Sequence, residues 1–207
     1  MKYERLSEKS ESLFLFCIYN LMEKDWQHLG ALLGRTFIVA SSENLPYWNG
    51  HSDESESDYE SIADLISTEE GNMTLYQKAG RQFYIFFSMA TKVELFRKGD
   101  SLFIIDGLLF NKSLEGVQNI QKQETEKISF NVSMPNSWLN VFDATLTGNE
   151  MGNNKTEGLH SAYKSDYYSY ASIKLKEGNY SVYRIILTCK LDGEEGELYG
   201  IELRKET

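Results

Sequence analysis

Alternating hydrophobic and polar residues dominate the chain from residue 72 onward and predict a mainly β structure. Short runs rich in aromatic and branched residues are separated by turn residues, as antiparallel strands joined by hairpins require. Gly80 and the pair Gly99-Asp100 mark two of these turns. The runs are MTLYQK, QFYIFFSM, TKVELFR, SLFIIDGLLF, KISFNVSM, SWLNVFDA, YASIKLK, NYSVYRIILTCKL and ELYGIELRK. Together with the buried-type strand TFIVAS (36–41), they predict about nine or ten antiparallel strands in two packed sheets.

The beginning of the chain has a helical period instead. Six apolar residues recur at intervals of three and four positions: Leu13, Phe14, Cys17, Ile18, Leu21 and Met22. This spacing predicts an amphipathic helix over about residues 8–24, which would cover a face or an edge of one sheet. The run is too short to span a bilayer, and it lacks the cleavage site of a signal peptide. The predicted fold is therefore α+β, mostly β, resembling a β-sandwich with an N-terminal helix.

The length and the polar segments indicate how the chain is organised. A chain of 207 residues with 41% hydrophobic residues can bury the core of one domain, so we expect residues 1–207 to form a single domain. The polar stretch 112–126 predicts a connection between two halves, 1–111 and 127–207. No internal sequence repeat is apparent. The segment 148–169 has few aliphatic residues and indicates a functional or a mobile loop.

Negative charge is concentrated in one segment. The formal net charge is -10, and no Lys or Arg lies between Arg35 and Lys78. That stretch contains nine acids: Glu43, Asp53, Glu54, Glu56, Asp58, Glu60, Asp64, Glu69 and Glu70. Nucleic acids and anionic membranes bind to clustered Lys and Arg, so neither is expected as a partner. A basic protein surface fits this composition better. A short helix is expected at 58–66, with Asp58 as its N-cap.

The sequence offers little support for catalysis or metal binding. His28, His51 and His160 lie outside every common catalytic motif, and surface or turn positions are expected for them. Cys17 and Cys189 are isolated, which argues against a zinc site or a disulfide framework. The acidic run places oxygens at alternate positions, as calcium loops do, but it lacks the central Gly and the closing Glu. We expect no enzymatic activity, no metal, no cofactor and a cytoplasmic location.

A series of short motifs supports a more specific interpretation. In chain order they are Trp26, Gly30 and Gly34 before TFIVAS, then LPYWNG, the acidic gap, Asp58-Tyr59, FDATLTG (142–148) and IKLKEGNYSV (173–182). Their order and spacing resemble those of the immunity protein 21 family of bacterial polymorphic toxin systems, over roughly residues 26–204. The N-terminal segment and the 148–169 loop depart from this pattern.

The resemblance implies a protein that binds a cognate toxin domain stoichiometrically and neutralises it without catalysis. A carboxylate-dense surface can occupy the basic groove of a toxin that attacks nucleic acid, and buried aromatic anchors would supply affinity. The expected toxin-binding residues are Tyr47, Trp48, Asp53, Glu54, Glu56, Asp58, Tyr59 and Glu60.

Three alternatives remain open at this point. LPYWNG could be a turn that closes the core, with Trp48 buried and Gly50 at positive φ. The chain could be a β-sandwich module that binds carbohydrate or another small ligand through four tyrosines: Tyr163, Tyr167, Tyr168 and Tyr170. An enzyme with a carboxylate mechanism would need two acids in one pocket with pKa values pushed apart.

Overall fold

The computed structural model describes residues 26–51, 57–66, 72–89, 91–106, 118–151, 156–162, 168–191 and 194–207. The predicted N-terminal helix at 8–24 lies outside these residues, as do Cys17 and residues 152–155 and 163–167 of the predicted 148–169 loop. The loop prediction is wrong for α3 (Gly148–Met151) and β9 (Gly158–His160), which are a short helix and a strand. None of the helices in the described ranges has the length and apolarity needed to cross a membrane.

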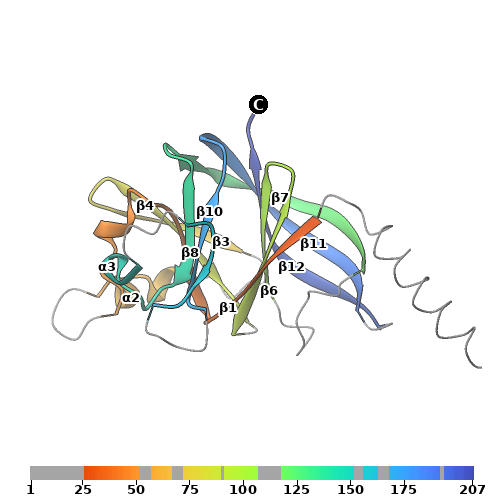
Figure 1. Ribbon diagram of the computed structural model, residues 1–207, viewed down its shortest axis with the longest axis horizontal. Helices are drawn as coiled ribbons and strands as arrows, with labels where there is room; N and C mark the ends of the chain where they lie inside the picture. The colour runs from red at the N-terminus through yellow and green to blue at the C-terminus, as the bar shows by residue number, and fades with distance from the viewer. Residues whose placement is uncertain are drawn as a thin grey trace, which may run out of the picture.

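Two antiparallel sheets of six strands each form the fold, which confirms the predicted β-rich architecture (Figure 1). Sheet 1 has the order β1 (Trp26–Leu33), β5 (Lys92–Lys98), β6 (Ser101–Asp106), β12 (Glu194–Lys205), β11 (Gly178–Leu191), β7 (Gln118–Met134). Sheet 2 has the order β3 (Met73–Lys78), β4 (Arg81–Phe87), β2 (Thr36–Ser41), β8 (Trp138–Asp143), β10 (Tyr170–Lys174), β9 (Gly158–His160).

The two halves of the chain share one strand order. Read inward from its two edges, sheet 1 gives β1, β5, β6 and β7, β11, β12, whereas sheet 2 gives β3, β4, β2 and β9, β10, β8. Each strand thus corresponds to the strand six places later. The halves meet at the antiparallel pairs β6–β12 and β2–β8, as a pseudo-twofold axis between them requires. The topology therefore repeats although no sequence repeat was apparent.

Matching hydrophobic positions, not matching residues, carry this repeat. Alternate side chains of a strand point to the same face. Equivalent strands each contribute two alternate residues to the core between the sheets: Phe37 and Val39 with Leu139 and Val141, Tyr84 and Phe86 with Ala171 and Ile173, Val93 and Leu95 with Tyr180 and Val182, and Leu102 and Ile104 with Ile201 and Leu203. The residue identities differ between the halves, so a direct comparison of the sequences misses the repeat.

The predicted polar connection at 112–126 is wrong for residues 118–126, which belong to β7. This part of β7 pairs with β11, and the register shifts at three places along the two strands. Its side chains from 121 to 127 are exposed. A strand at the edge of a sheet with solvated side chains shows no hydrophobic alternation, which explains why the segment resembled a loop.

Short helices cover the outer face of sheet 2. They are η1 (Leu45–Tyr47), α2 (Asp58–Ser61), η2 (Ala63–Leu65) and α3 (Gly148–Met151). Figure 1 shows α2 and α3 at the end of the molecule away from sheet 1. Buried residues of these segments pack against the outward side chains of β2, β4 and β8: Leu45, Trp48, Ile62 and Met151 over Ile38, Phe83, Ile85 and Phe142. We call this second cluster the outer core.

The predicted helix at 58–66 is present as α2 and η2, but its N-cap differs from the prediction. Ser57 is the N-cap, and its hydroxyl accepts a hydrogen bond from the Glu60 backbone N–H at 3.3 Å. Asp58, the predicted cap, is the first helical residue. Its carboxylate is turned inward to a lysine, which removes it from the capping position.

Candidate functional site

The LPYWNG turn closes the outer core. Trp48 is only 1% exposed, and its indole Nε1–H donates to the Ala144 carbonyl at 3.1 Å. Gly50 has φ +61, and a Cβ there would lie 2.6 Å from the backbone of Leu146. Only glycine adopts such a position without strain. The interpretation of this turn as a core-closing element is therefore confirmed, and Trp48 contacts this chain's own core.

Asp58 joins the acidic segment to sheet 2. Both of its carboxylate oxygens accept from Lys78 Nζ at 2.8 Å, and Oδ2 also accepts from the Asn49 backbone N–H at 2.7 Å. The hydroxyl of Tyr76 lies 3.4 Å from Oδ1. The Asp58 side chain is 3% exposed. A buried carboxylate with this many donors is a structural tether, and it holds α2 against β3.

The other predicted contact residues differ in their exposure. Tyr47 is 41% exposed, and Glu60 is exposed on α2. Tyr59 is half-buried against the outer core and makes an edge-to-face contact with the ring of His51. Asp53, Glu54 and Glu56 lie outside the described residues. Tyr47 belongs to the turn, and the Tyr59 backbone N–H donates to the Gly50 carbonyl of that turn at 3.1 Å. Trp48 and Asp58 hold the turn through their bonds to Ala144 and Asn49.

Arg81 forms an exposed cluster with Tyr47 and Glu43. Its guanidinium carbon lies 4.7 Å from the Tyr47 ring centroid, and its Nη1 lies 3.6 Å from Glu43 Oε1. The ion pair is longer than a hydrogen bond, and both side chains are more than one-third exposed. Exposed pairs of this kind contribute little to stability. The Glu43 carboxylate consequently stays accessible to a partner.

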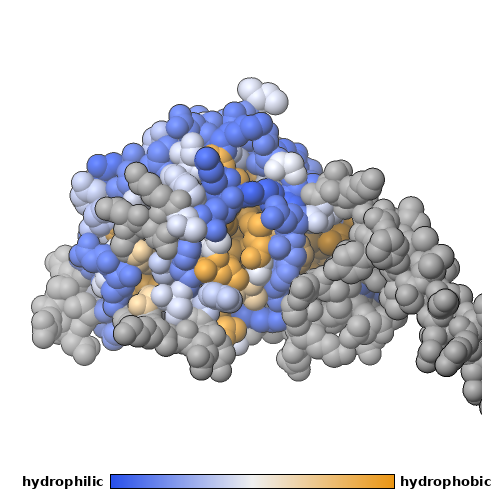
Figure 2. Space-filling view, in the orientation of Figure 1, coloured by the Kyte–Doolittle hydropathy of each residue, from blue (hydrophilic) through white to orange (hydrophobic). Residues whose placement is uncertain are grey.

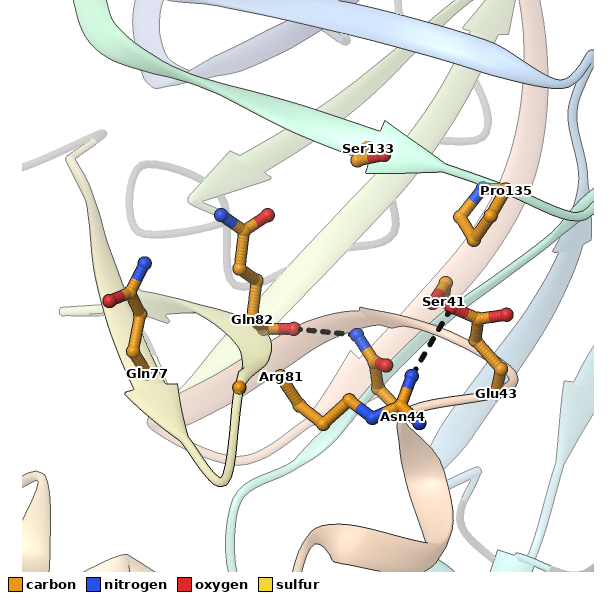
Figure 3. Close-up of a pocket in the computed structure, with 9 residues that line it drawn as sticks. Ser41, Glu43, Asn44, Gln77, Arg81, Gln82, Ser133 and Pro135 are labelled. Carbon is orange, nitrogen blue, oxygen red and sulfur yellow. Dashed lines mark hydrogen bonds and ion pairs between the residues drawn. The ribbon is translucent and has the colours of Figure 1, made fainter.

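A polar pocket opens beside this cluster, between the two sheets (Figure 3). We call it the inter-sheet pocket. Its volume is about 230 Å³, and nine residues line it: Ser41, Glu43, Asn44, Gln77, Gly80, Arg81, Gln82, Ser133 and Pro135. Figure 3 shows Ser133 on β7 and Pro135 just beyond its end, across from the other labelled residues. The pocket therefore joins β7 of sheet 1 to β2, β3 and β4 of sheet 2.

Two buried polar atoms in this pocket have no hydrogen-bond partner. The Asn44 Nδ2 donates to the Gln82 carbonyl at 3.0 Å, which leaves Oδ1 as an unsatisfied acceptor. The Ser41 hydroxyl is unsatisfied as well. Two of the lining residues also bond to Tyr84: its hydroxyl lies 2.9 Å from Gln82 Oε1 and accepts from the Ser133 N–H at 3.3 Å. Burial raises the pKa of Tyr84, so this hydroxyl stays protonated.

A second cavity, of about 410 Å³, lies on the outer face of sheet 1 beside Trp26 and Phe103. Glu202 borders it, accepting from Ser101, Lys122 and Arg204 at 2.7–3.2 Å. Burial alone would raise the pKa of Glu202, but these hydrogen bonds outweigh it and the pKa is lowered. The Glu202 carboxylate is thus ionised and bound by three neighbouring side chains. Together the four residues form a structural ion cluster.

A similar cluster surrounds Glu94. His28 Nε2 lies 2.7 Å from its Oε2, and Lys92 Nζ lies 3.1 Å from its Oε1. Burial opposes ionisation of Glu94, yet the bonds to His28 and Lys92 dominate and lower its pKa. The expected surface or turn position of His28 is wrong, because it lies half-buried in β1. The two partners are 66 residues apart, so no local sequence signal indicated the contact.

An enzyme with a carboxylate mechanism and a metal site each need particular groups, for which the described residues can be searched. Carboxyl groups with a resolved shift all have lowered pKa values: Glu94, Glu124, Glu157 and Glu202. A general acid near neutral pH needs a raised pKa. Within the described ranges, no group of three or more His, Cys, Asp or Glu could hold a metal ion.

The tyrosine platform proposed for a carbohydrate is divided in the structure. Tyr168 is exposed, whereas Tyr170 is buried and stacks on His160. Tyr163 and Tyr167 lie outside the described residues.

Figure 2 shows a mainly hydrophilic described surface in this view, with hydrophobic residues visible near its middle. Comparison of the chain with family models, curated proteins and solved structures gives no match.

Proposed function

We propose that this chain is an immunity protein of the immunity protein 21 type, which binds and neutralises a toxin domain with a basic surface. It acts in the cytoplasm, stoichiometrically and without catalysis. The observation that supports the proposal most strongly is the tether of Asp58 to Lys78. It fixes α2, which also carries Glu60, to β3 of sheet 2, within a stretch of sequence that has no Lys or Arg between Arg35 and Lys78.

Charge and exposed contact area occur together on this surface. The carboxylates of Glu43, Glu60 and Asp64 are exposed on segments that cover the outer core. Tyr47 and Leu65 are the large exposed apolar side chains of the same segments, at 41% and 39% exposure. Complementary charge accelerates encounter with a basic partner, and apolar anchors contribute most of the affinity.

The exposure of their side chains divides the proposed contact residues into two groups. In this proposal Tyr47, Tyr59 and Glu60 contact the toxin directly, together with Asp53, Glu54 and Glu56. Trp48 and Asp58 do not contact the toxin but support the residues that do, because both side chains are bound within this chain. A rigid support of this kind lowers the entropy cost of binding.

A reconstitution experiment tests the function. The chain is mixed with the toxin domain encoded by the neighbouring reading frame, and complex formation and toxin activity are measured together. The proposal predicts a 1:1 complex and a loss of toxin activity that is complete at equimolar protein. Full toxin activity in the presence of excess protein would refute it.

A further inference from the structure

The inter-sheet pocket holds an unusual share of the unsatisfied polar atoms. Buried donors and acceptors without partners are costly, so folded proteins contain few of them. Over the described residues, four buried side-chain atoms lack a hydrogen-bond partner: Ser41 Oγ, Asn44 Oδ1, Arg97 Nε and Arg184 Nε. Two of the four line this pocket. Ser41 and Asn44 are 2% and 8% exposed, so neither is satisfied by open solvent.

The chemistry of these atoms defines what the pocket binds. The orientation of the Asn44 amide is set by its donation to the Gln82 carbonyl, so its Oδ1 can only accept. Ser41 supplies a hydroxyl that accepts as well as donates. The Glu43 carboxylate adds further acceptors at the exposed rim. A ligand must therefore bring several hydrogen-bond donors, and positive charge is favourable where it meets Glu43.

We propose that the inter-sheet pocket binds the guanidinium group of an arginine side chain presented by the partner protein. The choice of an arginine rests on the basic partner of the proposed function. A guanidinium carries five donors in a planar fork, so it serves several oxygens at once, and it is more weakly hydrated than an ammonium. The incoming group displaces Arg81 from Glu43, a pair that is 3.6 Å long and exposed.

The pocket is preorganised for this role. Ser41 ends β2, Gln82 lies in β4 and Ser133 lies in β7, so three strands fix the backbone of the walls. The Tyr84 hydroxyl connects β4 to β7, because it lies 2.9 Å from the Asn131 carbonyl oxygen and accepts from the Ser133 N–H. Walls that are already ordered minimise the entropy lost on binding.

NMR titration with a small probe tests this site without the toxin. Isotope-labelled protein is titrated with N-acetyl-arginine amide and, as a matched control, with N-acetyl-citrulline amide, which has the same shape and no charge. We expect saturable shifts of the backbone amides of Ser41, Asn44 and Gln82 with the arginine derivative. The citrulline derivative should bind about tenfold more weakly, because charge-assisted hydrogen bonds are the stronger ones.

Two pocket variants and one control complete the experiment. Ser41→Ala removes an unsatisfied hydroxyl, so it should preserve the fold and weaken binding of the arginine derivative about fivefold. Asn44→Ala should weaken binding further, and Ser137→Ala, outside the pocket, should leave binding unchanged. Absence of saturable shifts, as in a pocket that holds only water, would overturn the inference. So would equal binding of the citrulline derivative, or unchanged binding by Ser41→Ala.

The titration tests the pocket and the toxin experiment tests the function, so each claim can be refuted without the other. Arginine binding in the pocket together with full toxin activity would refute the proposed function and keep the site. Neutralisation of the toxin without any probe binding would refute the site and keep the function.

Discussion

Lys78 donates to both carboxylate oxygens of Asp58, at 2.8 Å each, across 20 residues of chain. The pair joins the end of β3 to the first residue of α2. It converts one of the nine acids in the segment from a surface charge into a structural tether. Glu60 and Asp64 follow it on α2 and η2.

Replacing Lys78 should destabilise the fold, because the buried Asp58 carboxylate then has no cation to pair with. We predict that Lys78→Met lowers the free energy of unfolding by about 3 kcal/mol, because Asp58 stays buried without its cation. The double variant Asp58→Asn/Lys78→Met should lose less, since no charge remains. Urea denaturation of the four proteins in the cycle measures both effects.

A matched surface pair provides the control for that cycle. Lys176 Nζ lies 2.7 Å from Asp100 Oδ2, a similar distance, but both side chains are more than half exposed. Lys176→Met should change stability by about 0.5 kcal/mol or less. Equal losses for Lys176→Met and Lys78→Met would show that the Asp58 tether has no special role.

Trp48 should contribute to stability and its neighbour Tyr47 to binding. Trp48→Phe leaves the Ala144 carbonyl without its donor and should cost about 2 kcal/mol, whereas Trp48→Ala should cost about 4 kcal/mol. Tyr47→Ala, at an exposed position, should change stability by about 0.5 kcal/mol or less. Thermal and urea unfolding distinguish the two positions, and a stable Trp48→Ala variant would contradict the burial that the structure shows.

Glu202 should make the fold sensitive to acid. Its pKa is lowered in the folded state, so ionised Glu202 stabilises the fold above the unfolded pKa of about 4.3. This contribution is lost as the pH falls through the lowered, folded-state pKa. We predict that Glu202→Gln is about 2 kcal/mol less stable than the wild type at neutral pH, and that the difference shrinks in acid.

The pH dependence is measured by urea unfolding at a series of pH values between about 3 and 7. Glu197→Gln, an exposed acid on the same strand, serves as the control and should follow the wild-type curve. A Glu202→Gln difference that stays constant across the series would contradict the ion cluster as its source.

Local sequence patterns predicted most of the sheets, because hydrophobic alternation is a property of neighbouring residues. The strand TFIVAS was identifiable since Phe37 and Val39 face one core and Ile38 and Ala40 the other. The polar part of β7 was not identifiable, because its hydrogen bonds are made to β11 and its side chains face solvent. The pseudo-twofold order was hidden for a similar reason, since it depends on which strands pair.

The features of the candidate site likewise fall into those that local sequence indicated and those that depend on distant residues. Burial of Trp48 and the positive φ of Gly50 could be anticipated from a Trp-Asn-Gly turn. The contact between Asp58 and Lys78 could not, because acids were abundant and nothing local distinguished this one. Ser41 and Asn44 gave no signal at all, because an unsatisfied atom is defined by its three-dimensional surroundings.

The central claim is that the acidic segment docks onto a basic protein surface, and the salt dependence of toxin binding tests it most directly. Affinity for the toxin domain is measured between about 0.05 and 0.5 M salt for the wild type and for Asp53→Asn/Glu54→Gln/Glu56→Gln/Glu60→Gln, with Asp58 kept intact. We predict weaker binding by the variant at low salt and a flatter dependence on salt. Equal affinities and equal slopes for the two proteins would contradict the claim.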